Sequence, residues 1–273
     1  MNTIESEIRR GERFSFGKNW RGFLSTLTDE SISVAQSSIK DMLGVERLDG
    51  KTFLDIGSGS GLFSLAARNL GASVHSFDYD PNSVGCTNEL RSRYFPNDPN
   101  WTVEQGSILD IDYIRSLKRF DIVYSWGVLH HTGSMWQAIE NAISLSNDSG
   151  ILFIAIYNDQ GIKSDFWRSI KKVFCSGIIG RSIISVIFIP CFFLLTLLSC
   201  ILTRENKFST YKKNRGMSII YDWLDWLGGL PFEVAKAEAI FSLFIKRGFF
   251  LTNLKTTNGL GNNQFVFSKN VPT

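Results

Sequence analysis

Short apolar runs alternate with longer segments of helical spacing between residues 51 and 156 of this 273-residue chain. The apolar runs are 52–56, 73–77, 101–104, 121–125 and 151–156. Helix candidates lie between them, near 60–70, 81–94 and 134–146, and Pro81 suits the first turn of the second one. Strands that alternate with helices at this spacing build βαβ units and therefore a parallel sheet covered on both faces.

The alternation stops after residue 156 and resumes near residue 232. A helix at 232–246 and strands at 249–256 and 263–268 then complete the pattern. We therefore predict an α/β protein with a Rossmann-like, doubly wound, mostly parallel seven-stranded sheet and an antiparallel C-terminal strand. Four parts follow: an N-terminal helical cap (1–48), a core (49–160), a helical and strongly apolar insertion (161–230), and a C-terminal helix and strand pair (231–273). The cap contains one amphipathic helix, whose apolar positions are Ile32, Ala35, Ile39 and Leu43.

The composition excludes only broad classes of function. The formal net charge of +3 is far below the dense basic face of an obligate nucleic-acid binder. Four cysteines without a CxxC pair argue against a zinc site, so we predict no metal. Cysteines inside an apolar run, together with a charged N-terminal segment that is unlike a secretion signal, favour a cytoplasmic setting.

A glycine loop joins the first strand to the first long helix at Gly57-Ser58-Gly59-Ser60-Gly61. Glycines there let the backbone turn sharply and let a ligand approach the positive N-terminus of the helix. A dinucleotide fingerprint requires a third glycine where Leu62 stands. Asp55 also precedes the loop, and its carboxylate suits a ligand with a cationic end better than a pyrophosphate. A nicotinamide dehydrogenase is therefore disfavoured.

The stretch LDIGSGSG at 54–61 resembles motif I of the class I S-adenosylmethionine-dependent methyltransferases. The resemblance implies that Asp55 and the loop hold the amino and carboxylate ends of the cofactor's methionine moiety. The loop residues concerned are Gly57, Ser58, Gly59 and Gly61.

Three further stretches resemble the family in the same order along the chain. Asp78 lies 21 residues after Gly57, matches the acidic residue that accepts hydrogen bonds from the ribose, and is followed by Tyr79 beside the adenine. The stretch GSILD at 106–110 matches the loop that contacts adenine, where Ser107 replaces a common Asp and is followed by Ile108. The fourth-strand motif ends at Ser125 and Trp126, which would line the cleft.

Methyl transfer from S-adenosylmethionine requires an aligned nucleophile and, where the acceptor is a hydroxyl group, a base that removes its proton. His131 is the preferred base and His130 the second choice; a purely structural role is the alternative for both. The stretch VLHHTG at 128–133 is similar to the polyprenyl-benzoquinol O-methyltransferases, in which a Glu-His pair is more usual. That similarity implies a small or lipid-linked, quinone-like hydroxyl acceptor.

Two more stretches resemble a bacterial-type branch of the same family. By that resemblance the segment with Phe16, Lys18, Asn19 and Trp20 covers the cofactor pocket, and 222–231 shapes the acceptor side. Core packing of the tryptophans is the alternative.

The 22 uncharged residues at 182–203 are long enough to cross a bilayer. A crossing would place the last helix and strands on the far side from the rest of their sheet, which is not tolerated. The basic residues on both sides instead favour an interfacial contact, bent at Pro190, with a peripheral location on the cytoplasmic membrane face. A buried cap helix and a homodimer interface are the alternatives. The flanking basic residues are Arg168, Lys171, Lys172 and Arg181 before the run, and Arg204, Lys207, Lys212, Lys213 and Arg215 after it.

Two other functions remain open at this point. An RNA methyltransferase would use the basic insertion to grip phosphates and would bind RNA in a salt-sensitive manner, although the chain has no strong nucleic-acid signal. A scaffold without catalysis would bind S-adenosylmethionine tightly without turnover.

Overall fold

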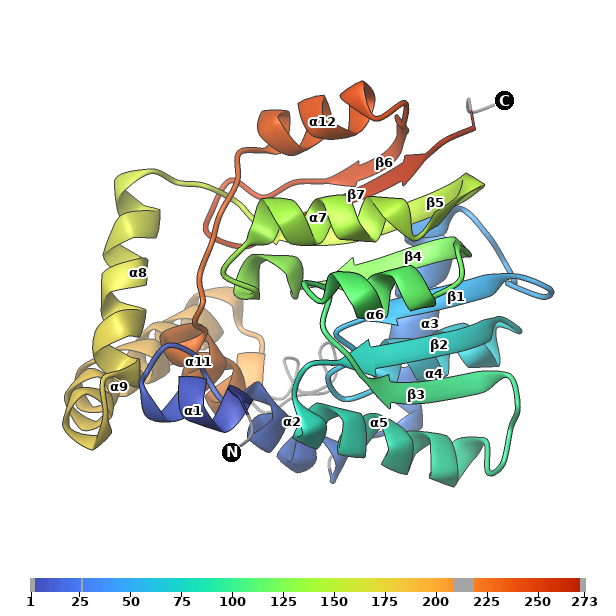
Figure 1. Ribbon diagram of the computed structural model, residues 1–273. Helices are drawn as coiled ribbons and strands as arrows, with labels where there is room; N and C mark the ends of the chain where they lie inside the picture. Colours follow the sequence, from blue (N-terminus) through green and yellow to red (C-terminus); the bar gives the residue numbers. More distant parts are fainter. Residues whose placement is uncertain (1–2, 26, 209–218, 271–273) are drawn as a thin grey trace.

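The computed structural model describes residues 3–25, 27–208 and 219–270. Its strands are β1 (Thr52–Ile56), β2 (Ser73–Asp78), β3 (Trp101–Gln105), β4 (Phe120–Trp126), β5 (Ser146–Tyr157), β6 (Phe250–Lys255) and β7 (Asn262–Ser268). They form one sheet in the order β3-β2-β1-β4-β5-β7-β6 (Figure 1). β7 runs antiparallel to β5 and β6, and the remaining pairs are parallel. The predicted fold class is confirmed.

Helices cover both faces of the sheet. On one face lie α3 (Asp29–Leu43), α4 (Leu62–Asn69) and α5 (Pro81–Tyr94); on the other lie α6 (Ile111–Ser116), α7 (Met135–Ser144) and α12 (Ala237–Lys246) (Figure 1). Side chains alternate along each strand, so Phe53 enters the apolar core under α3–α5, while Leu54 and Ile56 enter the core under α6, α7 and α12. Each face of the sheet therefore has its own apolar core, as expected for a parallel sheet, which is covered on both faces.

The strand order reverses beside β1, which pairs with β2 on one side and β4 on the other. Ligands of open α/β sheets bind outside the carboxyl ends of the strands at such a switch point. The cap and the insertion lie beside this end of the sheet (Figure 1). The topology therefore predicts a ligand site at the carboxyl ends of β1, β2 and β4.

The predicted helix at 232–246 begins five residues late, at Ala237. Residues before it run extended beside the end of β5: the N–H of Glu233 donates to the carbonyl of His130 at 3.0 Å, and the N–H of Ala235 donates to the carbonyl of Tyr157 at 3.0 Å. These bonds replace the first helical turn and bring the end of the insertion to the histidines.

In its described residues, the N-terminal cap contains the helices α1 (Thr3–Arg9), α2 (Phe16–Leu24) and α3. α3 begins at a Thr28 N-cap, whose hydroxyl accepts from the N–H of Ser31, and ends at Gly44 in the left-handed conformation. The apolar stripe predicted for α3 is buried as expected, and its last member, Leu43, packs at the margin of the core under α3–α5.

The insertion contains α8 (Ile162–Cys175), α9 (Ile178–Thr203) and α11 (Ile219–Gly228). A small apolar core of its own holds it together, with Phe174, Ile184 and Leu227 buried around Phe14 of the cap. Cap and insertion therefore pack on each other. Lys171 is 0% exposed, so the expectation that it faces lipid headgroups is wrong. Lys212, Lys213 and Arg215 lie outside the described residues.

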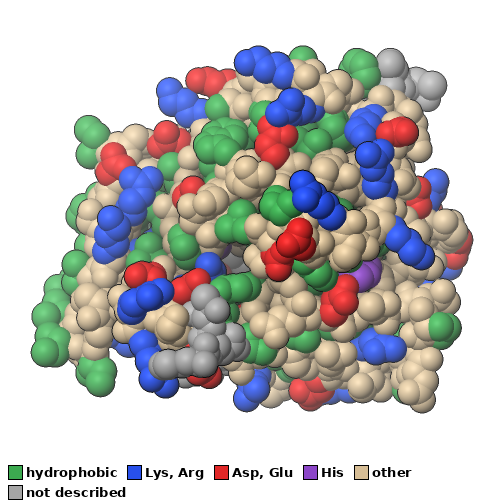
Figure 2. Space-filling view, in the orientation of Figure 1, with side chains coloured by type: hydrophobic (Ala, Val, Ile, Leu, Met, Phe, Trp, Pro, Cys, Tyr) green, Lys and Arg blue, Asp and Glu red, His purple; other side chains and the backbone are tan. Residues whose placement is uncertain are grey.

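α9 is longer than the predicted apolar run and continues through Pro190 without a break. It is long and apolar enough to cross a membrane, yet only 6% of its most apolar window is buried. Figure 2 shows apolar side chains gathered at the edge of the molecule where Figure 1 places α8 and α9. The alternative of a buried cap helix is therefore wrong.

Candidate functional site

The glycine loop turns sharply between β1 and α4. Gly57, Gly59 and Gly61 all have positive φ values, of 77°, 55° and 82°. A Cβ atom on Gly57 would lie 2.4 Å from a methyl group of Val128, and one on Gly61 would lie 2.8 Å from the backbone of Thr87. Glycine is required at these two positions, because side chains would both strain the backbone and collide with neighbours.

Two carboxylates flank the loop as predicted. Asp78 ends β2 half-buried, and its carboxylate accepts from the N–H of Gly59 at 2.9 Å and from the N–H of Asp80 at 2.8 Å. Burial raises the pKa of Asp78 to about 6, although these two bonds and the charge of Arg13 act in the opposite direction. The middle of the loop is thus hydrogen-bonded to the carboxylate expected to hold a ribose.

Asp55 is more deeply buried than the prediction required. Its side chain is 2% exposed and accepts a 2.5 Å hydrogen bond from Ser64 Oγ of α4. Burial raises its pKa to about 7, and the charge of Asp78 adds to this. Its contact with a methionine moiety remains a prediction, as does that of Ser58, whose hydroxyl lies 2.9 Å from that of Thr87.

The adenine-side residues are divided between surface and core. The Tyr79 hydroxyl donates to Glu7 of α1 at 3.2 Å. Ser107 Oγ accepts from the N–H of Leu109, whereas the Ile108 side chain is 4% exposed and belongs to the core under α6 and α7. Only a backbone group of Ile108 is therefore available to a ligand.

The end of β4 is likewise mostly internal. Ser125 is buried and donates to the carbonyl of Ile56 at 3.2 Å, which joins β4 to β1 at the switch point. Trp126 is half-buried and packs against the core under α3–α5. Ser125 thus has no free side chain, and the role of Trp126 as a cleft wall remains a prediction.

α2 lies over the glycine loop. The Trp20 ring lies 3.1 Å from the position that a Cβ of Gly59 would take, and the N–H of Gly17 donates to the carboxylate of Asp80 at 3.1 Å. Phe16 lies 5.0 Å from His131 between ring centroids. The segment thus spans both predicted halves of the site; the side chains of Lys18 and Asn19 lie outside the described part of the chain.

His131 is held in one tautomer. Its Nδ1 lies 2.6 Å from the carbonyl oxygen of Pro231, so Nδ1 bears the hydrogen and Nε2 keeps a lone pair. Burial lowers the pKa of His131 to about 3, and the charges of Lys171 and Arg13 lower it further. The imidazole is therefore neutral at physiological pH.

His130 is fully buried behind His131, and their ring centroids are 4.5 Å apart. Its Nδ1 accepts from the N–H of Tyr157 at 3.3 Å, and its Nε2 has no hydrogen-bond partner among the residues described. Burial, together with the charges of His131 and Lys171, lowers its pKa well below the ordinary value.

An aromatic cluster of Tyr157, Trp226 and Phe232 surrounds the histidines. Between ring centroids, Tyr157 lies 4.1 Å from His130 and 5.5 Å from His131. The same ring lies 5.7 Å from Trp226 and 5.3 Å from Phe232. The predicted 222–231 stretch therefore does approach the histidines.

Sequence reasoning missed Arg13. Its guanidinium lies 5.0 Å from the centroid of the Tyr79 ring, pairs with Glu7 at 2.6 Å and donates to the carbonyl of His131 at 3.2 Å. It therefore joins the adenine side to the histidine side. A single arginine in a charged, aperiodic stretch carries no sequence signal for this position.

No cluster of three or more His, Cys, Asp or Glu side chains suited to a metal ion occurs within residues 3–25, 27–208 and 219–270. The open parallel sheet, the glycine loop and the carboxylate at the end of β2 define a protein of the Rossmann-like, nucleotide-cofactor-binding class. Comparison with known families is more specific. The chain belongs to the methyltransferase-domain family, whose model matches residues 31–174, more than half of its length.

Curated relatives resemble only part of the chain. It is 34% identical over 114 residues to a ribosomal protein L11 methyltransferase of Prochlorococcus marinus, covering 41% of this chain and 37% of that protein. It is 29% identical over 119 residues to a ubiquinone biosynthesis O-methyltransferase of Methylobacterium, covering 44% and 46%. The chain thus spans less than half the length of these relatives.

Among solved structures, the magnesium protoporphyrin IX methyltransferase of Synechocystis with bound SAH covers 98% of this chain and 96% of its own. The TM-score is 0.53 at 15% identity, a likeness that shows the fold alone.

Proposed function

We propose that this protein transfers the methyl group of S-adenosylmethionine to a hydroxyl oxygen of a small or lipid-linked acceptor. The proposal depends on two groups on opposite sides of the switch point: the Asp78 carboxylate at the end of β2, and a neutral His131 with a lone pair on Nε2, which follows β4. A family model alone gives the methyltransferase class; the acceptor is inferred from the histidine.

The residues present suit this cofactor. Asp78 is partly exposed, and each of its oxygens accepts one backbone N–H, which leaves lone pairs for two ribose hydroxyls. The elevated pKa values of Asp55 and Asp78 mark carboxylates whose burial is not balanced by the cations of the protein, and the cofactor has cationic sulfonium and amino groups. Asp78 would hold the ribose, and the glycine loop with Asp55 would face the methionine end.

S-adenosylmethionine supplies a methyl group already activated by its sulfonium. The protein has to align the acceptor and remove its proton. His131 Nε2 would accept a hydrogen bond from the acceptor hydroxyl, while the Nδ1–H bond to Pro231 fixes the ring. Because its lowered pKa makes the imidazole a weak base in the free protein, the proton would pass to Nε2 as the oxygen lone pair forms the new C–O bond. The C–S bond would break in the same step, and the sulfur would keep its electron pair. Trp20 and Phe16 exclude water from the two halves of the site.

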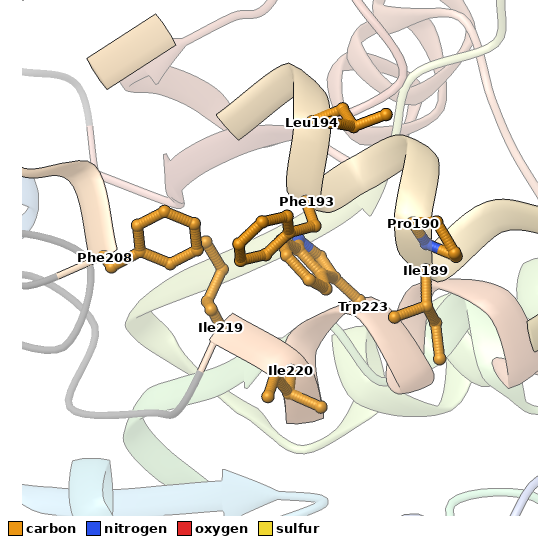
Figure 3. Close-up of a pocket in the computed structure, with 8 residues that line it drawn as sticks. All are labelled: Ile189, Pro190, Phe193, Leu194, Phe208, Ile219, Ile220 and Trp223. Atoms are coloured by element: carbon orange, nitrogen blue, oxygen red, sulfur yellow. The ribbon is translucent and has the colours of Figure 1, made fainter. Parts of the chain in front are cut away.

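An apolar groove supports the lipid-linked form of the acceptor. Its volume is about 550 Å³, and it lies between α9 and α11. Apolar side chains line it, among them Ile189, Phe193, Phe208, Ile219 and Trp223 (Figure 3). Trp223 contacts Phe192, Phe192 stacks on Trp167, and Trp167 contacts Trp226 of the aromatic cluster. An apolar tail in the groove would therefore lead toward the histidines.

We also propose that α9 rests on the cytoplasmic membrane face. Exposed residues on it include Val186, Leu195 and Leu202, which are 74%, 63% and 75% exposed. Apolar area of this size favours transfer into the lipid interface. The L195E/L202E double variant should lose sedimentation with anionic vesicles, whereas I162E, at the exposed start of α8, should retain it. Wild-type protein that stays in solution as a stable dimer would instead assign α9 to a homodimer interface.

The reaction is tested with methyl-labelled S-adenosylmethionine, purified protein and a cell extract, followed by partition of the products. We expect label in the organic phase for the wild type and D148N, whose side chain is 94% exposed, and none for D78A. Label in RNA or protein would replace the hydroxyl acceptor by another class. Cofactor binding without any transfer of label would indicate the scaffold.

A further inference from the structure

A buried ammonium group on the acceptor side takes no part in the proposed reaction. Lys171 extends from α8 and is 0% exposed. Its Nζ donates to the carbonyl of Trp226 and lies 4.5 Å from the centroid of the Trp226 ring and 4.8 Å from that of Phe232. Two of the three residues of the aromatic cluster around the histidines thus also enclose this ammonium.

We infer that Lys171 binds an anionic oxygen of the acceptor, so that the substrates are phenolates, enolates or carboxylates and not amines. This inference rests on the proposed function and specifies its acceptor. It makes Lys171 a binding residue of the same site.

The hydrogen bonds of Lys171 leave capacity for a ligand. An ammonium has three donors, and one is used, by the Trp226 carbonyl. Burial lowers the pKa of Lys171 to about 7, while the nearby Cys175 and Asp225 raise it. A buried cation with so few polar partners is costly unless an anion joins it.

The surrounding charges have the same sign. Lys171 and Arg13 both lower the pKa of His131, and Lys171 also lowers that of His130. Methylation of an amine would add a positive charge beside these groups. An oxygen anion, in contrast, is stabilised by the positive charges, so this field favours the binding and ionisation of an oxygen acceptor.

The two kinds of acceptor differ only in where their proton goes. A phenol or enol would pass its proton to His131 Nε2 as the O–CH₃ bond forms, whereas a carboxylate arrives ionised. In both cases the electrons of the broken S–CH₃ bond would remain on sulfur. Lys171 forms no covalent bond; it stabilises the negative charge on the acceptor oxygen.

Benzoate and its neutral analogue benzamide are suitable probes. Their affinities are measured by calorimetry on the full-length protein saturated with S-adenosylhomocysteine. We expect the wild type to bind benzoate about tenfold more tightly than benzamide, because a hydrogen-bonded charge contributes that much. K171M should bind both equally, whereas K172M, which changes the exposed neighbouring lysine, should keep the preference. An equal affinity in the wild type, or an unchanged preference in K171M, would overturn the inference.

A second measurement needs no variant. Benzoate stays ionised from pH 6 to 9, so its affinity for the wild type should fall several-fold as Lys171 loses its proton, while benzamide affinity should stay constant. Of the groups facing Lys171, Cys175 keeps its proton over most of this range because burial raises its pKa to about 11, and both histidines are neutral by virtue of their lowered pKa values; Asp225 raises the pKa of Lys171 through its charge. A flat benzoate profile overturns the inference. Failure to bind S-adenosylhomocysteine would overturn the proposed function itself, whereas cofactor binding without benzoate preference overturns this inference alone.

Discussion

The two halves of the site are electrostatic opposites. On the cofactor side, burial raises the pKa values of Asp55 and Asp78 to about 7 and about 6. On the acceptor side, burial lowers the pKa values of His131 and Lys171 to about 3 and about 7. In each case the loss of water outweighs the opposite charges nearby, such as Arg13 beside Asp78 and Asp225 beside Lys171.

The contrast indicates what each half lacks. Buried carboxylates are stabilised by a cation, and a buried ammonium by an anion. Perturbed groups of this kind gather at functional sites more often than elsewhere. A sulfonium donor on one side and an oxygen nucleophile on the other would satisfy both sets of groups at once.

The largest effect is expected for H131Q, which removes the base from the acceptor half. Turnover of the organic-phase acceptor should fall about 100-fold or more, because a positioned base contributes that much. Cofactor affinity should stay unchanged, since His131 is on the other half. H75Q provides the control, because His75 pairs with Glu104 at 2.6 Å, remote from both histidines. Retention of more than half the turnover by both H131Q and H130A would exclude a histidine base.

The two halves of the site also differ in how well the sequence predicts them. The strands, α5 and the glycine loop depend on local patterns, and most of their predicted bounds agree with the structure to within about two residues. β5 is the exception, because it begins at Ser146 and not at residue 151. α6 has six residues, too few to show a period, and was not predicted.

The acceptor half depends on tertiary contacts that a sequence does not display. Lys171 reads as one of several basic residues, yet it is buried because α8 and α11 meet around it. Arg13 reaches His131 across 118 residues of sequence. Asp55 was identified by its motif, but its burial under Ser64 depends on the packing of α4.

A smaller effect is expected for D78N, which weakens the cofactor half. The amide keeps one acceptor oxygen but has no charge, so affinity for S-adenosylhomocysteine should fall about 30-fold. Calorimetry of D78N against D148N measures this directly. If D78N bound the cofactor as tightly as the wild type, the ribose contact assigned to Asp78 would be wrong.

The pH dependence of cofactor binding compares the halves without a mutation. Both carboxyl groups are partly protonated near pH 6 in the free protein, because their pKa values are raised, and a bound cation favours the ionised forms. Affinity for S-adenosylmethionine should therefore rise about tenfold between pH 5.5 and 8 and then level off. D55N should flatten the upper part of this rise. An affinity that fell with pH would reverse the sign and contradict the contrast.

The smallest effect is expected for R13Q, which acts on both halves. Arg13 lowers the pKa values of Asp78 and of His131, so its loss should shift the cofactor-binding profile to higher pH by a few tenths of a unit. The KM for S-adenosylmethionine near pH 6 should rise a few-fold, because a partly solvated charge pair contributes about 1 kcal/mol. R10Q is the matched control, since Arg10 lies on the surface with a side chain 61% exposed. An unshifted profile in R13Q would mean that the cap touches the site without coupling its two halves.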